Sequence, residues 1–159
     1  MSAVALEHQI YTIKEYLEIN NNALERYEYH DGFIRAMSGG TINHGVLCNN
    51  AGTILNNGIQ AKKSNCISFG SEVKVQIEKS NSFIYPDAML VCGGVQTSEH
   101  DPNAVVNPLL VVEVLSKSTE RYDRGDKFHK YCYLTSFKEY VLIDQYKPVV
   151  DILYKADAS

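Results

Sequence analysis

Two carboxylates lie in stretches of sequence where a charge is costly to bury. Glu113 interrupts the apolar run 109–115, which has the composition of a buried β-strand. Asp87 follows Pro86 and directly precedes the apolar run 88–92. Burying an unpaired carboxylate costs several kcal/mol, so a cation, a metal ion or a raised pKa must compensate. Two such carboxylates on neighbouring strands make a candidate site for a hard cation such as Mg²⁺.

Both carboxylates also have a structural interpretation. Pro-Asp often forms only a turn, and a glutamate near a strand end often pairs with a lysine. The hypotheses differ in geometry. A metal site places the Asp87 and Glu113 carboxylates around one gap of cation size, whereas a purely structural interaction domain leaves them far apart or in salt bridges.

Cationic side chains follow Glu113 in a polar loop and a predicted helix. They are candidates for phosphate contacts, and they comprise Lys117, Arg121, Arg124, Lys127 and Lys130. The simpler interpretation is a solvated helix face with ion pairs between residues four apart, such as Asp123 with Lys127. We favour that interpretation for Arg121 and Lys130, and we keep Lys117, Arg124 and Lys127 as candidates.

Two helices are expected in the first part of the chain, from their caps and apolar periodicity. A capping box at Thr12 begins a helix over 12–20. A longer helix is expected over 44–63, with Thr41 or Asn43 as its N-cap. Its predicted buried stripe consists of Leu47, Ala51, Ile54, Leu55 and Ile59.

A β-hairpin is expected between these helices, over 27–37. Asp31-Gly32 is a strong signal for its two-residue turn. In that register Glu28 lies opposite Arg35, so the hairpin offers these two side chains a cross-strand ion pair.

The rest of the chain predicts a mixed β-sheet with one further helix. The expected strands are 66–69, 72–78, 83–92, 109–115, 139–144 and 149–154, and the helix is 120–134. Residues 72–78 alternate between apolar and polar side chains, which predicts one wet face, and Pro86 interrupts 83–92. The fold class is therefore α/β at the border of α+β, a mixed central sheet flanked by helices, with 88–92 and 109–115 at its buried centre.

Length and composition are those of one globular domain. The chain has 159 residues, 45% of them hydrophobic, and its formal charge of −4 excludes a chain-wide basic field for nucleic acid. The sequence contains no CxxC pair, and we expect buried reduced thiols at Cys48, Cys66, Cys92 and Cys132. Residues 1–9 lack the apolar segment of a signal peptide, and no apolar run is long enough to cross a membrane. We therefore expect a single domain over 1–159 in the cytoplasm.

Six segments of the sequence together resemble a known family. They are 27–32 (YEYHDG), 43–44 (NH), 85–87 (YPD), 112–119 (VEVLSKST), 123–127 (DRGDK) and 139–144 (EYVLID). In this order they resemble the Uma-two family of restriction endonucleases, within the PD-(D/E)XK nuclease superfamily. The resemblance implies a restriction-endonuclease-like core over about residues 11–154. It also implies a nuclease that uses Mg²⁺ or Mn²⁺ and acts on DNA. We expect no association with a membrane. A homodimer would match the two-fold symmetry of a duplex.

The resemblance assigns roles to individual residues. Asp87 and Glu113, with the main-chain carbonyl of Val114, would hold the metal ion, which polarises the phosphodiester and generates hydroxide from water. The lysine of the superfamily belongs two residues after the glutamate, where this chain has Leu115. Lys127 matches a lysine that recurs in the family, so we expect it to stabilise negative charge in the transition state.

Two further residues have roles that the sequence leaves open. Glu28 matches an acidic position of the family and is either an additional metal or water ligand or the surface partner of Arg35. His44 is either a general base or phosphate contact, or an ordinary residue at the helix N-terminus.

The sequence supports two functions. The first is a magnesium-dependent endonuclease that hydrolyses phosphodiester bonds in DNA. The alternative is a catalytically impaired nuclease-fold protein that binds nucleic acid or a protein partner. Leu115 and the acidic charge favour the alternative, whereas the carboxylates in apolar strands favour the enzyme, because burying them without a metal ion is costly.

Overall fold

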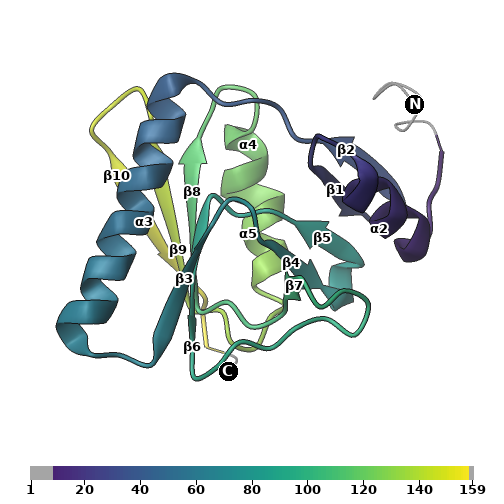
Figure 1. Ribbon diagram of the computed structural model, residues 1–159. Coiled ribbons are helices and arrows are strands. Elements are labelled where there is room, and N and C mark those ends of the chain that lie inside the picture. Colours follow the sequence, from purple (N-terminus) through teal and green to yellow (C-terminus); the bar gives the residue numbers. More distant parts are fainter. Residues whose placement is uncertain (1–8, 158–159) are drawn as a thin grey trace.

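The structure is a computed structural model that describes residues 9–157. Two five-stranded mixed sheets form the frame, and helices pack against them (Figure 1). The expectation that no signal peptide is present concerns residues 1–9, and all of these except Gln9 lie outside the described residues. Within 9–157, no helix is both long and apolar enough to cross a membrane.

The sheet that carries Glu113 has the strand order β10-β9-β8-β6-β3. Strands β8 and β9 are parallel, and the other neighbours are antiparallel. With β8 central and β6 beside it, the structure confirms the predicted centre of the mixed sheet. The strands are β3 (Cys66–Gly70), β6 (Ala88–Cys92), β8 (Leu110–Leu115), β9 (Glu139–Asp144) and β10 (Val150–Tyr154).

Helix α3 (Ile42–Lys62) covers one face of this sheet. Its Ala51 clusters with Ala88 of β6 and Val112 of β8. The Thr41 hydroxyl accepts a hydrogen bond from the N–H of His44 and caps the helix, which confirms one of the two predicted caps. The predicted buried stripe is confirmed only at Ala51, because a narrow strip of the helix meets the sheet. Leu47, Leu55 and Ile59 are partly buried, and Ile54 is 69% exposed.

A helical segment covers the opposite face (Figure 1). It consists of α4 (Glu120–Tyr122), a π-helical turn η2 (Asp123–Lys127) and α5 (Phe128–Tyr131), rather than the single α-helix predicted over 120–134. Successive strand residues point to opposite faces. Glu113 therefore shares its face of β8 with Leu115, beneath this segment.

The second sheet has the order β2-β1-β5-β4-β7 and packs against helix α2 (Ile13–Asn22). Tyr16 of the helix stacks on Tyr29 at a centroid distance of 5.2 Å. The predicted capping box at Thr12 and the predicted hairpin register are both confirmed. The elements are β1 (Tyr27–His30), β2 (Phe33–Ala36), β4 (Lys74–Ile77), the 3₁₀ turn η1 (Glu78–Ser80), β5 (Ser82–Ile84) and β7 (Ala104–Val105).

Two strand predictions differ from the structure. Residues 83–92 form parts of two strands, β5 and β6, which belong to different sheets. Pro86 cannot donate to a ladder, so pairing stops there and the chain crosses between the sheets. The wet face predicted for 72–78 is wrong because Lys74 is buried and its Nζ pairs with Asp101 Oδ2 at 2.7 Å.

The prediction of four buried, reduced cysteines is also wrong. Cys66 and Cys92 are register partners on β3 and β6, and they form a disulfide bond. Cys48 and Cys132 are free and only partly buried. The bonded pair has no sequence signal, because its residues are 26 positions apart and meet only through the sheet register.

Candidate active site

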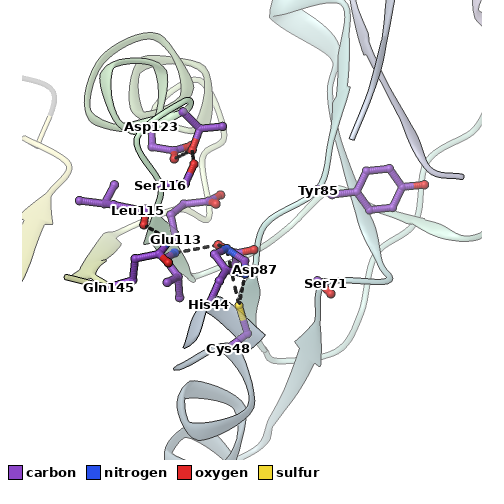
Figure 2. A network of polar contacts seen from close by, with 12 residues as sticks. His44, Cys48, Ser71, Tyr85, Asp87, Glu113, Leu115, Ser116, Asp123 and Gln145 are labelled. Carbon is purple, nitrogen blue, oxygen red and sulfur yellow. Dashed lines mark hydrogen bonds and ion pairs between the residues drawn. The ribbon is translucent and has the colours of Figure 1, made fainter. Parts of the chain in front are cut away.

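A cavity of about 480 Å³ opens where β8 ends, and residues of both sheets and of α3 line it. Most of the sequence-predicted site residues meet there. Figure 2 shows His44, Asp87, Glu113 and Asp123 converging from separate elements. The predicted residues that line the cavity are Glu28, His44, Asp87, Glu113, Val114, Lys117 and Lys127.

Glu113 and Lys127 form a buried ion pair at the base of this cavity. The Lys127 Nζ atom lies 2.8 Å from Glu113 Oε1, and the two residues are 5% and 3% exposed. Lys127 also donates a hydrogen bond to the Tyr85 carbonyl at 3.1 Å. A salt-bridged Glu113 is what the structural interpretation expects, whereas the presence of Asp87 in the same cavity favours a cation site.

A third charged group, Asp123, completes the surroundings of the lysine. Its Oδ1 lies 3.8 Å from Lys127 Nζ, and its Oδ2 accepts a hydrogen bond from Thr119 at 2.7 Å. Burial raises the pKa of Asp123 and raises that of Glu113 well above its usual value. Burial alone would lower the pKa of Lys127, but the surrounding carboxylates, Glu113 foremost, hold it well above its usual range. The lysine therefore stays charged, whereas burial favours the protonated forms of the two carboxyl groups.

Glu28 is buried and faces the cavity, although it is the register partner of Arg35. Its Oε1 accepts the N–H of Tyr85 at 2.8 Å, and its Oε2 contacts His30 Nε2 at 3.1 Å. Burial opposes ionisation of Glu28, but Lys127 and His30 outweigh it and lower the pKa. Tyr85 thus links two site residues through its main chain, because its N–H binds Glu28 and its carbonyl binds Lys127.

Asp87 enters the cavity at the crossing between the sheets. Its Oδ2 accepts the N–H of Val114 at 2.7 Å and lies 3.4 Å from His44 Nε2. Burial opposes ionisation of Asp87, but these two partners lower its pKa. The hydrogen bond to Asp87 raises the pKa of His44 to about 10. His44 is therefore a cation at neutral pH, a state suited to contact with phosphate rather than to general-base catalysis.

The two remaining candidates lie at different places. Lys117 is exposed at the cavity rim, with its Nζ 5.5 Å from the centroid of the Tyr146 ring. Arg124 does not line the cavity, and its guanidinium pairs with Glu120 at 3.0 Å and Asp151 at 2.9 Å. The structure thus separates Arg124 from the other predicted residues.

Sequence reasoning missed three contributors to the site. Asp123 is four residues before Lys127, a spacing that we noted but interpreted as a solvated pair. Gln145 is buried, donates to the Leu115 carbonyl at 2.7 Å and accepts from Thr41 at 2.8 Å. The main chain of Tyr85 is the third. Nothing in the local sequence marks Gln145, and the segment 85–87 (YPD) does not indicate the main-chain bonds of Tyr85, because the partners of both residues are distant in the chain.

The arrangement fits a hard divalent cation. Glu28, Asp87, Glu113 and Asp123 all line the cavity. Among the residues that the structure describes, Glu113 Oε1 is buried with the Lys127 ion pair and no hydrogen bond. The N–H and C=O of one strand residue leave the strand on the same side, so the Val114 carbonyl points to the side of Asp87. Carboxylate and carbonyl oxygens are the ligands of Mg²⁺ and similar ions.

Comparison with known proteins identifies the family. The sequence model of the Uma2 family, described as "Putative restriction endonuclease", matches residues 13–158. The chain belongs to this family. Two similar proteins come from Synechocystis sp. The uncharacterized protein slr1290 is 34% identical over 144 residues, which cover 91% of this chain and 74% of that protein. The uncharacterized protein sll1609 is 33% identical over 138 residues, which cover 87% and 77%.

A solved structure shows the same fold as this Uma2 chain. It is a crystal structure from Anabaena variabilis described as "a putative nuclease belonging to DUF820". The match has a TM-score of 0.74 at 14% identity and covers 93% of this chain and 82% of that one. The predicted restriction-endonuclease-like core is thereby confirmed. Uma2 membership places the chain among nuclease-type proteins, a group that acts on nucleic acid and generally uses divalent metal ions.

Proposed function

We propose that this chain is an endonuclease that hydrolyses phosphodiester bonds in DNA with Mg²⁺ or Mn²⁺. The observation that carries the proposal is the position of Lys127. Its ammonium lies 2.8 Å from Glu113 in a cavity that also contains Asp87. The chain thus has two carboxylates and a lysine in one place, although position 115 is a leucine.

Each residue then has a defined task. Asp87, Glu113 and the Val114 carbonyl would hold the cation, which supplies Lewis-acid activation of the phosphodiester and of a water molecule. Lys127 places a fixed positive charge where negative charge develops in the transition state. Glu28, oriented by the Tyr85 N–H and by His30, is available to accept a proton from the attacking water.

The net charge of the chain does not attract a polyanion, but positively charged side chains at the cavity rim can. Arg26, Arg35 and Lys117 line the cavity, and His44 adds a positive charge beside Asp87. These side chains can bind phosphates at the cavity, although the formal charge of the whole chain is −4. A homodimer would present two such cavities to the two strands of a duplex, and sedimentation of the chain alone and with duplex DNA tests this part of the proposal.

The decisive experiment is a cleavage assay on supercoiled plasmid, linear duplex, single-stranded DNA and RNA. Each substrate is incubated with Mg²⁺, Mn²⁺ or a chelator. Asp87→Asn and Lys127→Met are compared with Asp126→Asn, whose exposed carboxylate lies outside the cavity on the same segment. We expect metal-dependent cutting of DNA that is lost in the first two variants and kept in Asp126→Asn.

Two other outcomes would contradict the proposal. Cutting that survives Asp87→Asn would place the activity elsewhere or in a contaminant. Absence of cutting, together with a retarded DNA band in gel electrophoresis, would assign the chain to the catalytically impaired binding module, with Leu115 as the physical reason.

A further inference from the structure

A second set of metal-ligating side chains lies on the α3 side of the cavity. It consists of His44, Cys48 and Asp87, each of which offers a ligand atom within 4.8 Å of the other two. Figure 2 shows the His44 ring between the Asp87 carboxylate and the Cys48 sulfur. We propose that these three residues form a site for a borderline-soft transition metal ion of the Zn²⁺ class.

Local structure brings the three side chains together. His44 and Cys48 are four residues apart on α3, so they project from the same face of the helix. The Thr41 cap fixes where that helix begins. Gly40 leaves room for the imidazole, because a Cβ atom there would lie 2.9 Å from His44 Nδ1. Asp87 is held from the other side by the Val114 N–H.

The nitrogen–oxygen separation matches that of a tetrahedral site, and the nitrogen–sulfur separation is close to it. Zinc–nitrogen and zinc–oxygen bonds of about 2.1 Å at the tetrahedral angle separate the two ligand atoms by about 3.4 Å. The observed His44 Nε2–Asp87 Oδ2 distance is 3.4 Å. A zinc–sulfur bond of about 2.3 Å predicts a nitrogen–sulfur separation of about 3.6 Å. The Cys48 sulfur lies 4.0 Å from His44 Nε2, the nitrogen that faces Asp87, so the thiol must approach by about 0.4 Å when the ion binds.

The chemistry of the ligands selects the class of metal. A thiolate and a neutral imidazole favour Zn²⁺ and its neighbours in the transition series, whereas Mg²⁺ prefers oxygen ligands alone. The ion therefore displaces the proton that His44 carries in the metal-free chain, and its binding strengthens as the pH rises. Three protein ligands leave one coordination position open to water or a substrate oxygen. The His44 and Asp87 side chains are 22% and 14% exposed, so an ion can reach them from solvent.

This site shares Asp87 with the cation site of the proposed endonuclease. One carboxylate cannot serve both ions in full, so Zn²⁺ at His44 and Cys48 should compete with Mg²⁺. That consequence rests on the proposed function, whereas the metal site itself does not. Zinc at low concentration is therefore expected to inhibit magnesium-dependent cleavage.

Binding of Co²⁺, a spectroscopic substitute for Zn²⁺, tests the site without any measurement of cleavage. The full chain should give a near-ultraviolet thiolate-to-cobalt charge-transfer band with a stoichiometry of one, and Zn²⁺ should abolish it. Cys48→Ser should remove the band and weaken Zn²⁺ binding at least about tenfold. Cys132→Ser is the matched control, because Cys132 is the other free and partly buried cysteine of the described chain, and it should keep the band.

Three outcomes would refute the proposed metal site. They are a cobalt spectrum without a thiolate band, a band that persists in Cys48→Ser, and a band that is lost in Cys132→Ser. Glu113→Gln separates this inference from the proposed function, since it should abolish cleavage and leave the cobalt band intact. A protein that binds Co²⁺ through Cys48 but never cuts DNA would support the metal site and refute the endonuclease.

Discussion

Lys127 supplies the buried positive charge of the site, so its replacement tests the electrostatics on which the proposed function depends. Lys127→Met keeps most of the side-chain volume and removes the charge. At the 2.8 Å separation from Glu113, an effective dielectric constant of about 20 gives a Coulomb attraction of about 6 kcal/mol. Desolvation offsets much of this attraction. Removing one partner of a buried pair nevertheless costs about 3–5 kcal/mol, because the other charge stays buried and unpaired.

Glu113→Gln should cost much less than Lys127→Met. Glu113 is one of several carboxylates near the lysine, and Asp123 and Glu28 remain to balance Lys127 when Glu113 is neutralised. Lys127→Met leaves these carboxylates without their shared buried cation. The free energy of unfolding, measured in urea with chelator present, should therefore fall by several kcal/mol in Lys127→Met and by less than half as much in Glu113→Gln.

Added Mg²⁺ should partly restore the stability of Lys127→Met. A cation at ten times its dissociation constant stabilises the folded state by about 1.4 kcal/mol. Lys117→Met is the matched control, because Lys117 is exposed at the same cavity and its loss should change stability by no more than about 0.5 kcal/mol. The reasoning fails if Lys127→Met loses under about 1 kcal/mol, or if Glu113→Gln is equally destabilised.

Three further results are expected. Burial raises the pKa of Glu113 above its unfolded value of 4.5, so its contribution to stability is full below pH 4.5 and is lost as the pH rises through the folded pKa. The difference in unfolding free energy between wild type and Glu113→Gln should therefore decrease from pH 4.5 toward neutrality, and a flat difference in urea titrations contradicts this. Asp87→Asn should abolish the rise in melting temperature that Mg²⁺ gives the wild type, whereas an unchanged rise would place the cation elsewhere. Arg124→Ala should change cleavage little, because its pairs lie outside the cavity, and a large loss would place a phosphate on that outer surface.

Local signals in the sequence were sufficient for the parts of the fold that depend on neighbouring residues. The capping box at Thr12, the two-residue turn at Asp31-Gly32 and the apolar strand around Glu113 each require only residues close in the chain. The same is true of Asp87 and Glu113, because a carboxylate in or beside an apolar strand is conspicuous without any knowledge of its partners, whereas the site roles of Glu28 and Lys127 came from the family resemblance.

Features that depend on sheet register or on crossings between sheets could not be predicted in this way. The alternation in 72–78 is real, but Lys74 is buried because Asp101 reaches it from a distant loop. Cys66 and Cys92 meet only because β3 and β6 pair in one register. The π-helical turn η2 also lacks a sequence signal, although such turns occur frequently at functional sites. For Lys74 and for the disulfide bond, the deciding contact comes from a segment far away in the chain.

The leucine at position 115 is compatible with a lysine in the site because of strand geometry. Positions 113 and 115 project from the same face of β8, and Leu115 is 2% exposed in the core against the opposing helical segment. A lysine at 115 would therefore point toward η2. Lys127 enters the same space from η2 itself, and its ammonium meets Glu113 at 2.8 Å. A lysine at 115 and the lysine at 127 would thus reach the same location from opposite sides of the interface between β8 and η2. The departure from the usual spacing changes the element that carries the lysine but keeps its ammonium beside the glutamate.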